Sequence, residues 1–540
     1  MLDRPALFLT AEKEDNDMET KPSFFISTPI YYVNAKPHLG HAYTSTLADC
    51  VARFHRLMGK ECFFVTGTDE HGEKIVQSAE KLGLTPKRLT DEISAEFKAI
   101  LPRLGAENTR FIRTTDPDHR AVVQRLLQVV YDKGDIYFGE YGGHYCYGCE
   151  RFYTGRELEN GLCPQHLKAP EYISEKNYFF RMSKYQGWLR QYILDNPDFI
   201  RPEQYRNEVL ALLDSGALED LCISRPKTRL EWGIELPFDQ NYVCYVWFDA
   251  LANYLTALDW RGEGVNDTAG VGNFARFWPN AQHIIAKDIL KPHAVFWPTM
   301  LKSAGLPTAR HLNVHGYWLS RATKMSKSLG NVVDPLQIID DYGLDAFRYF
   351  ILREMRFGND ASFTEEAFVS RLNTDLSNGL GNLFSRVLAM ANKYFDSRVP
   401  DPGPAGAGET EIRRLSREAL DAFRKAYDGF DFSFALESLW SLVRGLNKYV
   451  DDSAPWLLAR AGDRDRLGTV LYTLLEGLRK VALHLWPVMP GTAGAMLEQL
   501  GQNFDPDDTD LAAEAEGYGS LGAGTVLATA SNLFPRRSAK

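Results

Sequence analysis

A short apolar strand that runs into a helix with two histidines in its first turn constrains the fold more than any other stretch. Residues 24–28 predict the buried strand, and the helix begins within residues 37–41, Pro-His-Leu-Gly-His. His38 and His41 face the same way on the first turn. The N-terminus of a helix attracts anions, so this turn is a candidate site for an ATP phosphate, and Gly40 allows close approach of the nucleotide. Taken alone, the two histidines also fit a surface pair or half of a metal site.

Length and composition narrow the class of protein. A chain of 540 residues exceeds what one core supports, so three or four domains are expected. No apolar run reaches membrane-spanning length, and the acidic start differs from a secretory signal or transit peptide. Seven cysteines, an odd number, favour a reducing cytoplasm over a disulfide framework. The net charge of -10 argues against nonspecific nucleic-acid coating, although a local basic face can still bind a folded RNA.

A second strand and three helices extend the opening pattern into half of an α/β domain. Residues 62–66 predict a buried strand that leads into residues 67–72, Gly-Thr-Asp-Glu-His-Gly, and helices are expected at 73–81, 91–104 and 117–133. This alternation indicates a doubly wound, Rossmann-like parallel sheet. Ligands bind at the carboxyl ends of such strands, so Asp69 is a candidate to hold a substrate ammonium group, although it also fits a helix N-cap.

The parallel sheet is expected to resume after an insert, with strands at 242–247, 283–286 and 312–315. Each of these strands ends in aromatic or polar residues, as a pocket between two halves of a sheet requires. Residues 324–328, Lys-Met-Ser-Lys-Ser, follow as a loop. Its two lysines, Lys324 and Lys327, are suited to neutralise a departing pyrophosphate.

The insert carries four residues of the types that bind zinc. Cys146 and Cys149 form one Cys-x-x-Cys turn, and Cys163 and His166 form a second pair thirteen residues later. Four protein ligands would close the coordination shell, so a single structural Zn²⁺ is predicted, on which folding of the insert would depend. A disulfide pair or scattered buried thiols remain the alternatives.

The last third of the chain is helical in pattern, with good examples at 376–394, 411–426, 434–450 and 466–485. A Pro/Gly-rich loop at 400–408 joins two of them. This region is predicted to form a helix bundle.

The two phosphate motifs, in this order and separation, resemble those of class I aminoacyl-tRNA synthetases, and their combination resembles the bacterial-type methionyl-tRNA synthetase family. The resemblance runs from about residue 24 to the carboxyl end and includes residues 28–34, 67–72, 245–250 and 454–456. It implies a Rossmann-like catalytic domain with a zinc-containing insert, followed by an all-α anticodon-binding bundle. The expected domains are a disordered tail (1–22), two catalytic halves (23–135 and 242–322), the insert (136–241), the Lys-Met-Ser-Lys-Ser loop with a stem-contact region (323–373) and the helical anticodon-binding domain (374–540).

The resemblance also implies a reaction. Methionine and ATP give methionyl-adenylate and pyrophosphate, and the acyl group then passes to the 3′-terminal adenosine of tRNA(Met), with Mg²⁺ accompanying ATP. Arg225 occupies the place of a family arginine that assists activation, although a surface salt bridge would explain it equally. By position, the catalytic residues would be His38, His41, Lys324, Lys327 and Arg225. The ATP-binding residues would be His38, Gly40, His41, Gly316, Tyr317, Lys324, Met325, Ser326, Lys327 and Ser328.

Two further sets of residues follow from the same resemblance. The methionine site would comprise Ile30, Tyr32, Asp69, Trp247, Ala250, Tyr254, Ile289 and His293, in which aromatic rings favour the thioether sulfur. The anticodon would be read by Asn382, Arg386 and Trp456, because exposed bases are recognised by stacking and by hydrogen bonds to their edges. Each aromatic residue, taken alone, also fits plain core packing.

The sequence departs from the pattern of this family at three points, and three other classes of protein are alternatives to it. Leu39 replaces a more usual isoleucine, there is one knuckle where some relatives have two, and a carboxyl-terminal dimerising appendage is not apparent, which favours a monomer. The alternatives are another class I synthetase, a small nucleotidyltransferase and a non-catalytic tRNA-binding paralogue. The chain has no room for a large editing domain, which counts against a branched-chain synthetase. The helical bundle counts against a small nucleotidyltransferase. The presence of all four phosphate-site residues counts against a non-catalytic paralogue.

Overall fold

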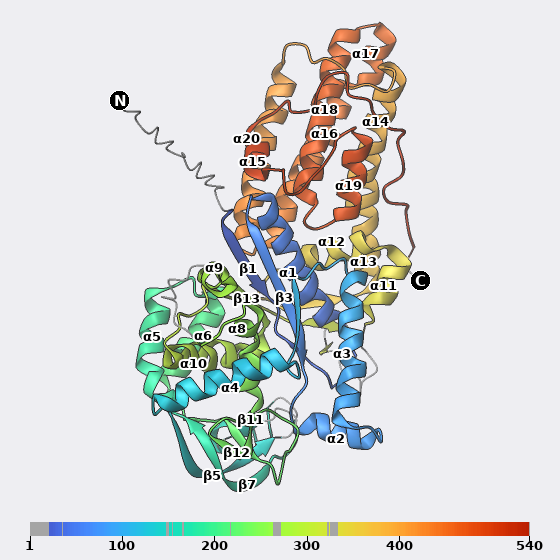
Figure 1. Ribbon diagram of the computed structural model, residues 1–540. Helices are drawn as coiled ribbons and strands as arrows, with labels where there is room; N and C mark the ends of the chain where they lie inside the picture. The colour runs from blue at the N-terminus through green and yellow to red at the C-terminus, as the bar shows by residue number, and fades with distance from the viewer. Residues whose placement is uncertain are drawn as a thin grey trace, which may run out of the picture.

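The computed structural model describes residues 21–538 apart from 35, 147–150, 154, 165–166, 217, 263–271, 321–322 and 325–332. Within this part of the chain a sheet forms the centre of the molecule and a long helical bundle extends from one end of it (Figure 1). An antiparallel insert lies at the opposite end. No helix in the described ranges is long and apolar enough to cross a bilayer.

The central sheet has seven strands, and every pairing in it is parallel. Its order is β2 (Tyr31–Tyr32), β3 (Glu61–Asp69), β1 (Ser23–Ser27), β13 (Ala281–Ala286), β14 (His311–His315) and β8 (Ile200–Arg201), with β4 (Arg110–Arg113) also paired to β3. The chain builds outward from β1 to β3 and later returns to β1's other side with β13. Ligands of doubly wound sheets bind at such a reversal, at the carboxyl ends of the strands.

Strand β1 faces two separate hydrophobic cores because successive side chains of a strand point to opposite faces. Phe24 and Ile26 pack with α1 (Leu39–Leu57) and with residues of the helical bundle. Phe25, between them, packs with α4 (Pro117–Asp132) and α10 (Trp297–Ala304) on the other face. A strand that is buried on both faces has a continuous apolar sequence, and β1 was predicted from such a stretch.

The predicted helices of the first half are present with small shifts at their ends. Helix α2 (Glu73–Lys81) has the predicted bounds, whereas α3 (Pro86–Arg103) begins five residues before the predicted start. Thr85 caps α3 by accepting a hydrogen bond from the Arg88 N–H, and Pro86 occupies the first turn, where its missing N–H costs nothing.

The described residues of the insert form two antiparallel sheets and two α-helices. One sheet contains β6 (Arg151–Tyr153), β5 (Ile136–Cys146), β7 (Glu171–Phe180) and β9 (Leu221–Cys222), and the other contains β10 (Ser224–Pro226), β12 (Asp239–Cys244) and β11 (Glu235–Leu236). Helices α5 (Gln186–Asp195) and α6 (Glu203–Asp214) flank β8, which belongs to the central sheet.

Two predictions about the central sheet were therefore wrong. Residues 242–247 do not resume the parallel sheet: β12 pairs antiparallel with β10 and β11, and α7 (Val246–Leu251) begins two residues after it ends. The expected insert also contains β8, a central strand. A short apolar run shows that a strand is buried but carries no information about its partner, and a two-residue strand is too short to leave a pattern.

The helical region is built as predicted, with one irregularity. It follows α11 (Pro335–Tyr342) and α12 (Leu344–Glu354) and comprises α13 (Glu365–Arg371), a π-helix (Leu372–Gly381), α14 (Asn382–Tyr394), α15 (Ala407–Asp428), α16 (Phe432–Ser453), α17 (Pro455–Ala461), α18 (Arg464–Leu485), α19 (Pro490–Gln499) and α20 (Leu511–Glu516). The prediction had a regular helix over 376–394, whereas the structure has π-helical turns up to Gly381. The remaining α-helices and strands of the described ranges are α8 (Asn253–Ala257), α9 (Asn273–Phe277), β15 (Trp318–Ser320), β16 (Thr323–Lys324) and β17 (Ala361–Phe363).

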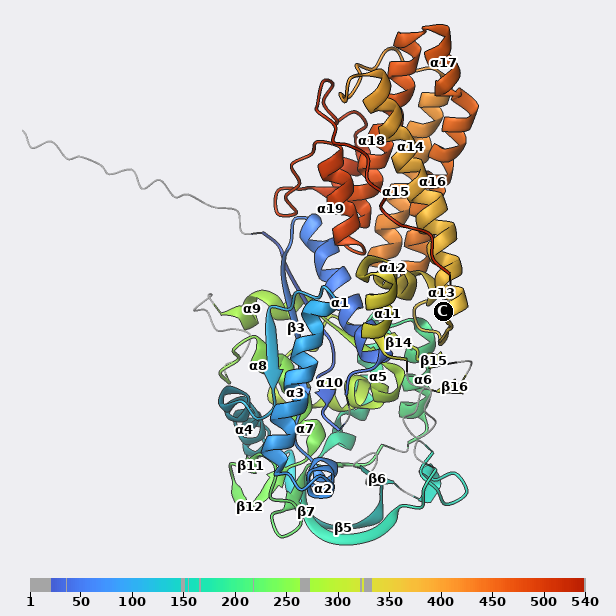
Figure 2. The same cartoon turned by 90° about the vertical axis from the view of Figure 1, so that its right-hand side faces the viewer.

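A buried arginine joins the bundle to the sheet. Arg348 of α12 is fully buried and donates to the Asp49 carboxylate of α1 at 2.6 Å. It also donates to the Pro487 and Val488 carbonyls, between α18 and α19, at 3.0 and 2.7 Å. Helix α1 lies alongside β3 and next to α12 in both views (Figures 1 and 2), so Arg348 ties the middle of α1 to the bundle.

Candidate active site

A cavity of about 700 Å³ opens at the carboxyl ends of β1, β3, β13 and β14. Residues 29–32 follow β1, Asp69 ends β3, residues 286–289 lie at and beyond the end of β13, and residues 315–318 lie at and beyond the end of β14. The reversal of strand order between β1 and β13 thus coincides with the hollow, as expected for a doubly wound sheet.

The cavity is lined by most of the residues predicted for small-molecule binding. All eight predicted methionine-site residues line it: Ile30, Tyr32, Asp69, Trp247, Ala250, Tyr254, Ile289 and His293. So do five of the ten residues predicted for ATP: His38, Gly40, His41, Gly316 and Tyr317. These side chains come from segments up to 287 positions apart, counting from Ile30 to Tyr317.

The two histidines lie at the start of α1 as the sequence predicted. His38 is the N-cap, and its Nδ1 accepts the Gly40 N–H at 3.1 Å. His41 Nδ1 accepts the His38 N–H at 3.2 Å, which completes a capping box. The rings are stacked with centroids 3.8 Å apart. Because each Nδ1 is an acceptor, the proton of each ring is on Nε2, which is the arrangement that can donate to a phosphate oxygen.

His41 is held in its neutral form by its surroundings. Burial, together with the neighbouring His38, lowers the pKa of His41 well below its ordinary value. The rings of Tyr31 and Phe97 pack edge-on against the His41 ring, with centroids 4.8 and 5.1 Å from the His41 centroid. A neutral imidazole fixed at a helix N-terminus acts as a hydrogen-bond donor, and the positive end of the helix dipole adds to the field at the same point.

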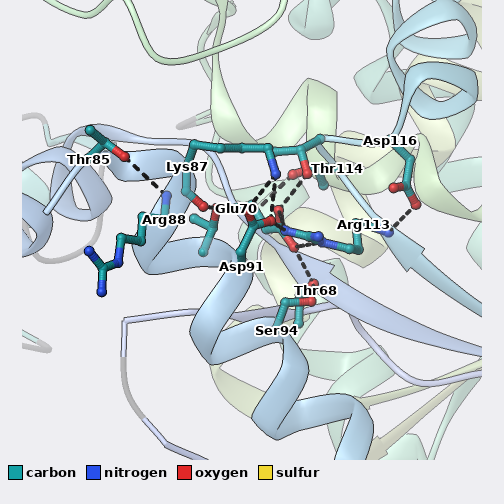
Figure 3. A network of polar contacts seen from close by, with 12 residues as sticks. Thr68, Glu70, Thr85, Lys87, Arg88, Asp91, Ser94, Arg113, Thr114 and Asp116 are labelled. Atoms are coloured by element: carbon teal, nitrogen blue, oxygen red, sulfur yellow. Dashed lines mark hydrogen bonds and ion pairs between the residues drawn. The ribbon is translucent and has the colours of Figure 1, made fainter.

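The loop that follows β3 is held by a network of buried polar groups (Figure 3). Glu70, next to Asp69, is fully buried and accepts two hydrogen bonds from Arg113 at 2.7 and 2.8 Å. The hydroxyls of Thr68 and Thr115 donate to the same carboxylate at 2.7 and 2.6 Å. Arg113 also reaches Asp91 of α3 at 2.6 Å. Removing any one partner would leave a buried charge poorly satisfied, so the network fixes the backbone at Asp69.

A second buried carboxylate, Asp249, lies between two histidines. His71 Nδ1 is 2.6 Å from Oδ2 of Asp249, and His119 Nε2 is 2.7 Å from Oδ1. Burial by itself would raise the pKa of Asp249, but the charges and hydrogen bonds of the two histidines outweigh it and lower this pKa to about 2. Asp249 is therefore ionised and fully paired inside the protein.

The far wall of the cavity contains a fixed tyrosine and histidine pair. The Tyr254 hydroxyl is 2.8 Å from Nε2 of His293, and Nδ1 of His293 is 2.9 Å from the Ile289 carbonyl oxygen. The carbonyl can only accept, so Nδ1 carries the proton and Nε2 accepts from the tyrosine. Burial lowers the pKa of His293 to about 4. This wall is consequently uncharged at neutral pH and suits an apolar side chain with a weakly accepting atom.

The side of the cavity beyond β14 approaches neighbouring backbone closely. A Cβ on Gly316 would lie 2.2 Å from the Asn359 carbonyl oxygen, so only glycine fits there. The Tyr317 N–H donates to Asp360 at 2.8 Å, and Lys287 is ion-paired with the same carboxylate. The Lys287 ammonium also lies 4.6 Å from the centroid of the Tyr317 ring.

Arg225 does not line this cavity. It is buried in the insert, where its guanidinium lies 4.5 Å from the Tyr245 ring and 5.0 Å from the Tyr145 ring and donates to the Ser224 carbonyl. The alternative of a surface salt bridge is excluded by this burial. Its predicted part in activation stays a prediction.

The second phosphate motif is described only at its beginning. Lys324 lies in the short strand β16, in register with Leu319 of β15. The predicted residues Met325, Ser326, Lys327 and Ser328 lie outside the described residues. Their roles stay predictions from the sequence.

The predicted zinc ligands are described in part. Cys146 and Cys163 are both buried and belong to one small cluster with Tyr153, whereas Cys149 and His166 lie outside the described residues. The Leu167 N–H donates to the Cys163 carbonyl at 2.8 Å, and the Cys163 N–H donates to the Lys168 carbonyl at 2.9 Å. None of the six described cysteines is in a disulfide, and no cluster of three metal-ligating side chains occurs within the described ranges. Two buried thiols in one cluster fit two of the four predicted zinc ligands.

The predicted anticodon residues lie on the bundle, away from the cavity. Asn382 and Arg386 are one turn apart on α14, and Arg386 donates to Asn447 of α16 at 3.2 Å. Trp456, in the first turn of α17, is 40% exposed, which is a large exposed fraction for an indole and excludes the alternative of core packing. All three therefore present polar or aromatic groups to solvent.

The sequence analysis gave no role to five residues around the site: Glu70, His71, Arg113, His119 and Asp249. Glu70, His71 and Asp249 lie inside the motifs already singled out, at 67–72 and 245–250, so their position was a usable signal. Arg113 and His119 had none, since each becomes significant only through a carboxylate 43 or 130 residues away.

Comparisons with known proteins agree on one family. The family model described as tRNA synthetases class I (M) matches residues 24–169 and 166–388. A methionine–tRNA ligase of Deinococcus radiodurans is 45% identical, over 96% of this chain and 75% of the relative, and one of Thermotoga maritima is 40% identical, over 96% and 81%. A solved structure of Mycobacterium tuberculosis methionyl-tRNA synthetase in complex with methionyl-adenylate is 40% identical, with a TM-score of 0.89 over 95% of this chain and all of that one.

Proposed function

This chain belongs to the class I methionyl-tRNA synthetases, and from that premise we propose that the cavity at the ends of β1 and β13 is where it joins methionine to AMP. The chain is a methionine–tRNA ligase. It activates methionine with ATP to methionyl-adenylate and pyrophosphate and then transfers the methionyl group to tRNA(Met).

One observation carries the assignment of the site. Eight side chains predicted for methionine and five residues predicted for ATP line a single cavity, although they come from distant parts of the chain. Residues matched to these roles by chance would be scattered over several surfaces. The convergence supports a ternary site in which amino acid and nucleotide meet.

The chemistry requires positioning and charge more than a protein nucleophile. The methionine carboxylate attacks the α-phosphorus, and negative charge grows on the phosphate oxygens as pyrophosphate departs. His38 and His41 would donate Nε2 hydrogen bonds to these oxygens, with Lys324 and Lys327 neutralising the leaving group. Mg²⁺ bound with ATP would supply further positive charge at these oxygens.

The amino acid would lie between Asp69 and the apolar walls. Asp69 would hold the ammonium group, and Trp247, Ala250 and Tyr254 would surround the side chain, with Ile30, Tyr32, Ile289 and His293 completing the pocket. The neutral Tyr254–His293 pair supports this assignment, because a charged wall would reject a thioether.

Amino-acid-dependent ATP–pyrophosphate exchange tests the proposal. The protein is incubated with each of the twenty amino acids, and we expect methionine to drive exchange far above leucine, isoleucine or cysteine. Exchange with another amino acid would mean that the pocket is wrongly assigned. No exchange with any amino acid would leave a tRNA-binding relative as the better interpretation.

We also propose one structural Zn²⁺ held by Cys146, Cys149, Cys163 and His166. When bound, the metal would tie the two turns of the knuckle together, and the buried thiols of Cys146 and Cys163 support the assignment. Metal analysis should give about one zinc per chain. Cys163→Ser should lose it, whereas Cys222→Ser, a matched cysteine of the same insert, should keep it. Unchanged folding with little zinc in the purified protein would contradict the proposal.

Asn382, Arg386 and Trp456 are proposed to read the tRNA anticodon. Their exposure on α14 and α17 of the bundle supports this role, since bases are recognised by stacking and edge contacts. The monomeric state and the cytoplasmic location stay predictions from the sequence. Light scattering of the purified protein, free and with tRNA, tests the first.

A further inference from the structure

A buried contact joins the chain segment that carries Asp69 to the segment that carries Trp247 and Ala250. Asp69, the proposed ammonium ligand, is two residues before His71. Asp249 is two residues after Trp247 and directly before Ala250, both of which line the cavity. The 2.6 Å hydrogen bond from His71 Nδ1 to Asp249 Oδ2 therefore links the segment of Asp69 to the wall formed by Trp247 and Ala250.

Both partners of this contact are rigidly held. His71 is 3% exposed, its ring packs against Trp232 with centroids 5.5 Å apart, and the Trp232 indole N–H donates to the Glu70 carbonyl at 2.7 Å. Asp249 is fully buried on the first turn of α7. A short charge-assisted hydrogen bond between two immobile segments holds them at a constant distance, because neither segment can move without breaking the bond.

The second histidine on Asp249 provides an internal comparison. His119 of α4 is equally buried and lies 2.7 Å from the other carboxylate oxygen. Its second ring nitrogen is 2.9 Å from the Thr256 hydroxyl. Neither α4 nor Thr256 contributes to the lining of the cavity. His119 thus stabilises Asp249 without connecting it to the ammonium end of the pocket.

We propose that the His71–Asp249 hydrogen bond sets the distance between Asp69 and the Trp247–Ala250 wall, so that the two residues are positioning residues that select amino acids by side-chain length. The inference rests on the proposed function of the cavity. Length matters because one methylene in an apolar pocket changes the preference only about 10- to 200-fold, and this discrimination is lost if the pocket can lengthen or shorten.

The test compares two histidine variants on three substrates. ATP–pyrophosphate exchange is measured for the wild type, His71→Ala and His119→Ala with methionine, with ethionine, which is one methylene longer, and with norleucine, which is of methionine's length. In His71→Ala we expect the KM for methionine to rise about tenfold and the preference for methionine over ethionine to fall about tenfold, the scale of one methylene. The KM for ATP and the preference for methionine over norleucine should stay within about twofold, since neither depends on pocket length.

The control variant separates positioning from general stability. His119→Ala removes an equally buried hydrogen bond from the same carboxylate and should lower the unfolding temperature, yet it should leave the methionine-to-ethionine preference unchanged. Equal loss of preference in both variants, or no loss in His71→Ala, overturns the inference.

Two further variants keep the test decisive if His71→Ala does not fold. His71→Asn keeps a donor at the δ position and should restore the preference, whereas His71→Gln moves the donor by one bond and should lower it. Preferences that are the same in these two variants overturn the inference. A wild type that shows no methionine-dependent exchange overturns the proposed function itself, which is a separate and distinguishable outcome.

Discussion

The cavity of the parallel sheet and the exposed face of the helical bundle hold their functional side chains in opposite ways. Around the cavity, Asp249 and His293 are buried, and each makes hydrogen bonds that fix its position and protonation. On the bundle, Trp456 is 40% exposed and the Arg386 side chain 38% exposed, with an ion pair to Asp451 of 3.8 Å. The bundle is stabilised by an extensive apolar core beneath these groups.

This difference teaches how one chain serves two kinds of ligand. A small substrate must be oriented to within a fraction of an ångström, so the groups around it are ordered before it binds. A nucleic-acid loop brings its own unstacked bases, and exposed side chains can adjust to them at the cost of ordering on binding. Variants in the two regions should therefore affect different steps.

The largest effect is expected at the start of α1. In His38→Asn the amide oxygen can still accept the Gly40 N–H and cap the helix, but the Nε2 donor to phosphate is lost. Loss of one such donor lowers the rate by roughly 100- to 1,000-fold. We expect this loss in ATP–pyrophosphate exchange, with unchanged unfolding temperature and tRNA affinity. A normal exchange rate would remove His38 from the catalytic set.

A smaller effect, on a different step, is expected on the bundle. Trp456→Ala should raise the KM for tRNA(Met) about 5- to 150-fold, since stacking of a base contributes about 1 to 3 kcal/mol. Exchange without tRNA should be unaffected. Phe434→Ala, which removes another exposed aromatic side chain of the bundle, is the matched control. It should change neither the KM for tRNA(Met) nor the exchange rate. If exchange fell in Trp456→Ala, the separation between the two regions would be broken.

The smallest effect concerns the stability of the buried cavity network and its pH dependence. The pKa of Asp249 is lowered to about 2 in the folded protein, so its ionised form stabilises the fold by about 2 kcal/mol above pH 4. This contribution decreases as the pH falls below about 4, where the unfolded aspartate takes up its proton, and it is lost at about pH 2, where the folded aspartate does so. Denaturant unfolding of the wild type and Asp249→Asn should differ most near neutral pH and converge in acid. A difference that is independent of pH would show that Asp249 is not held ionised by its histidines.

Much of the catalytic architecture could be predicted because the signals are local. The apolar runs of β1, β3, β13 and β14 and the helix start at His38 each lie within one short stretch, where periodicity and capping chemistry act. The eight methionine-site residues came from resemblance to a family, and the structure brings them to one cavity. The roles of Arg225 and the second lysine motif are still predictions.

The errors have a common cause. Residues 242–247 were assigned to the wrong sheet, β8 was not recognised, and the π-helical turns at Leu372–Gly381 were read as a regular helix. In each case the local pattern records which side chains are buried, but the partner or the hydrogen-bond register is chosen by packing. The Glu70–Arg113 pair was missed for the same reason.

The sequence by itself determined the alternation of strands and helices, the phosphate-binding turn and the helical character of the last third, because these depend on neighbours within a few residues. Only the tertiary structure decided that Asp249 lies between His71 and His119, that Arg348 joins α1 to the bundle, and that Arg225 is buried away from the cavity. A buried charge is stable only where complementary groups surround it, and those groups are brought together by the packing of elements far apart in the chain.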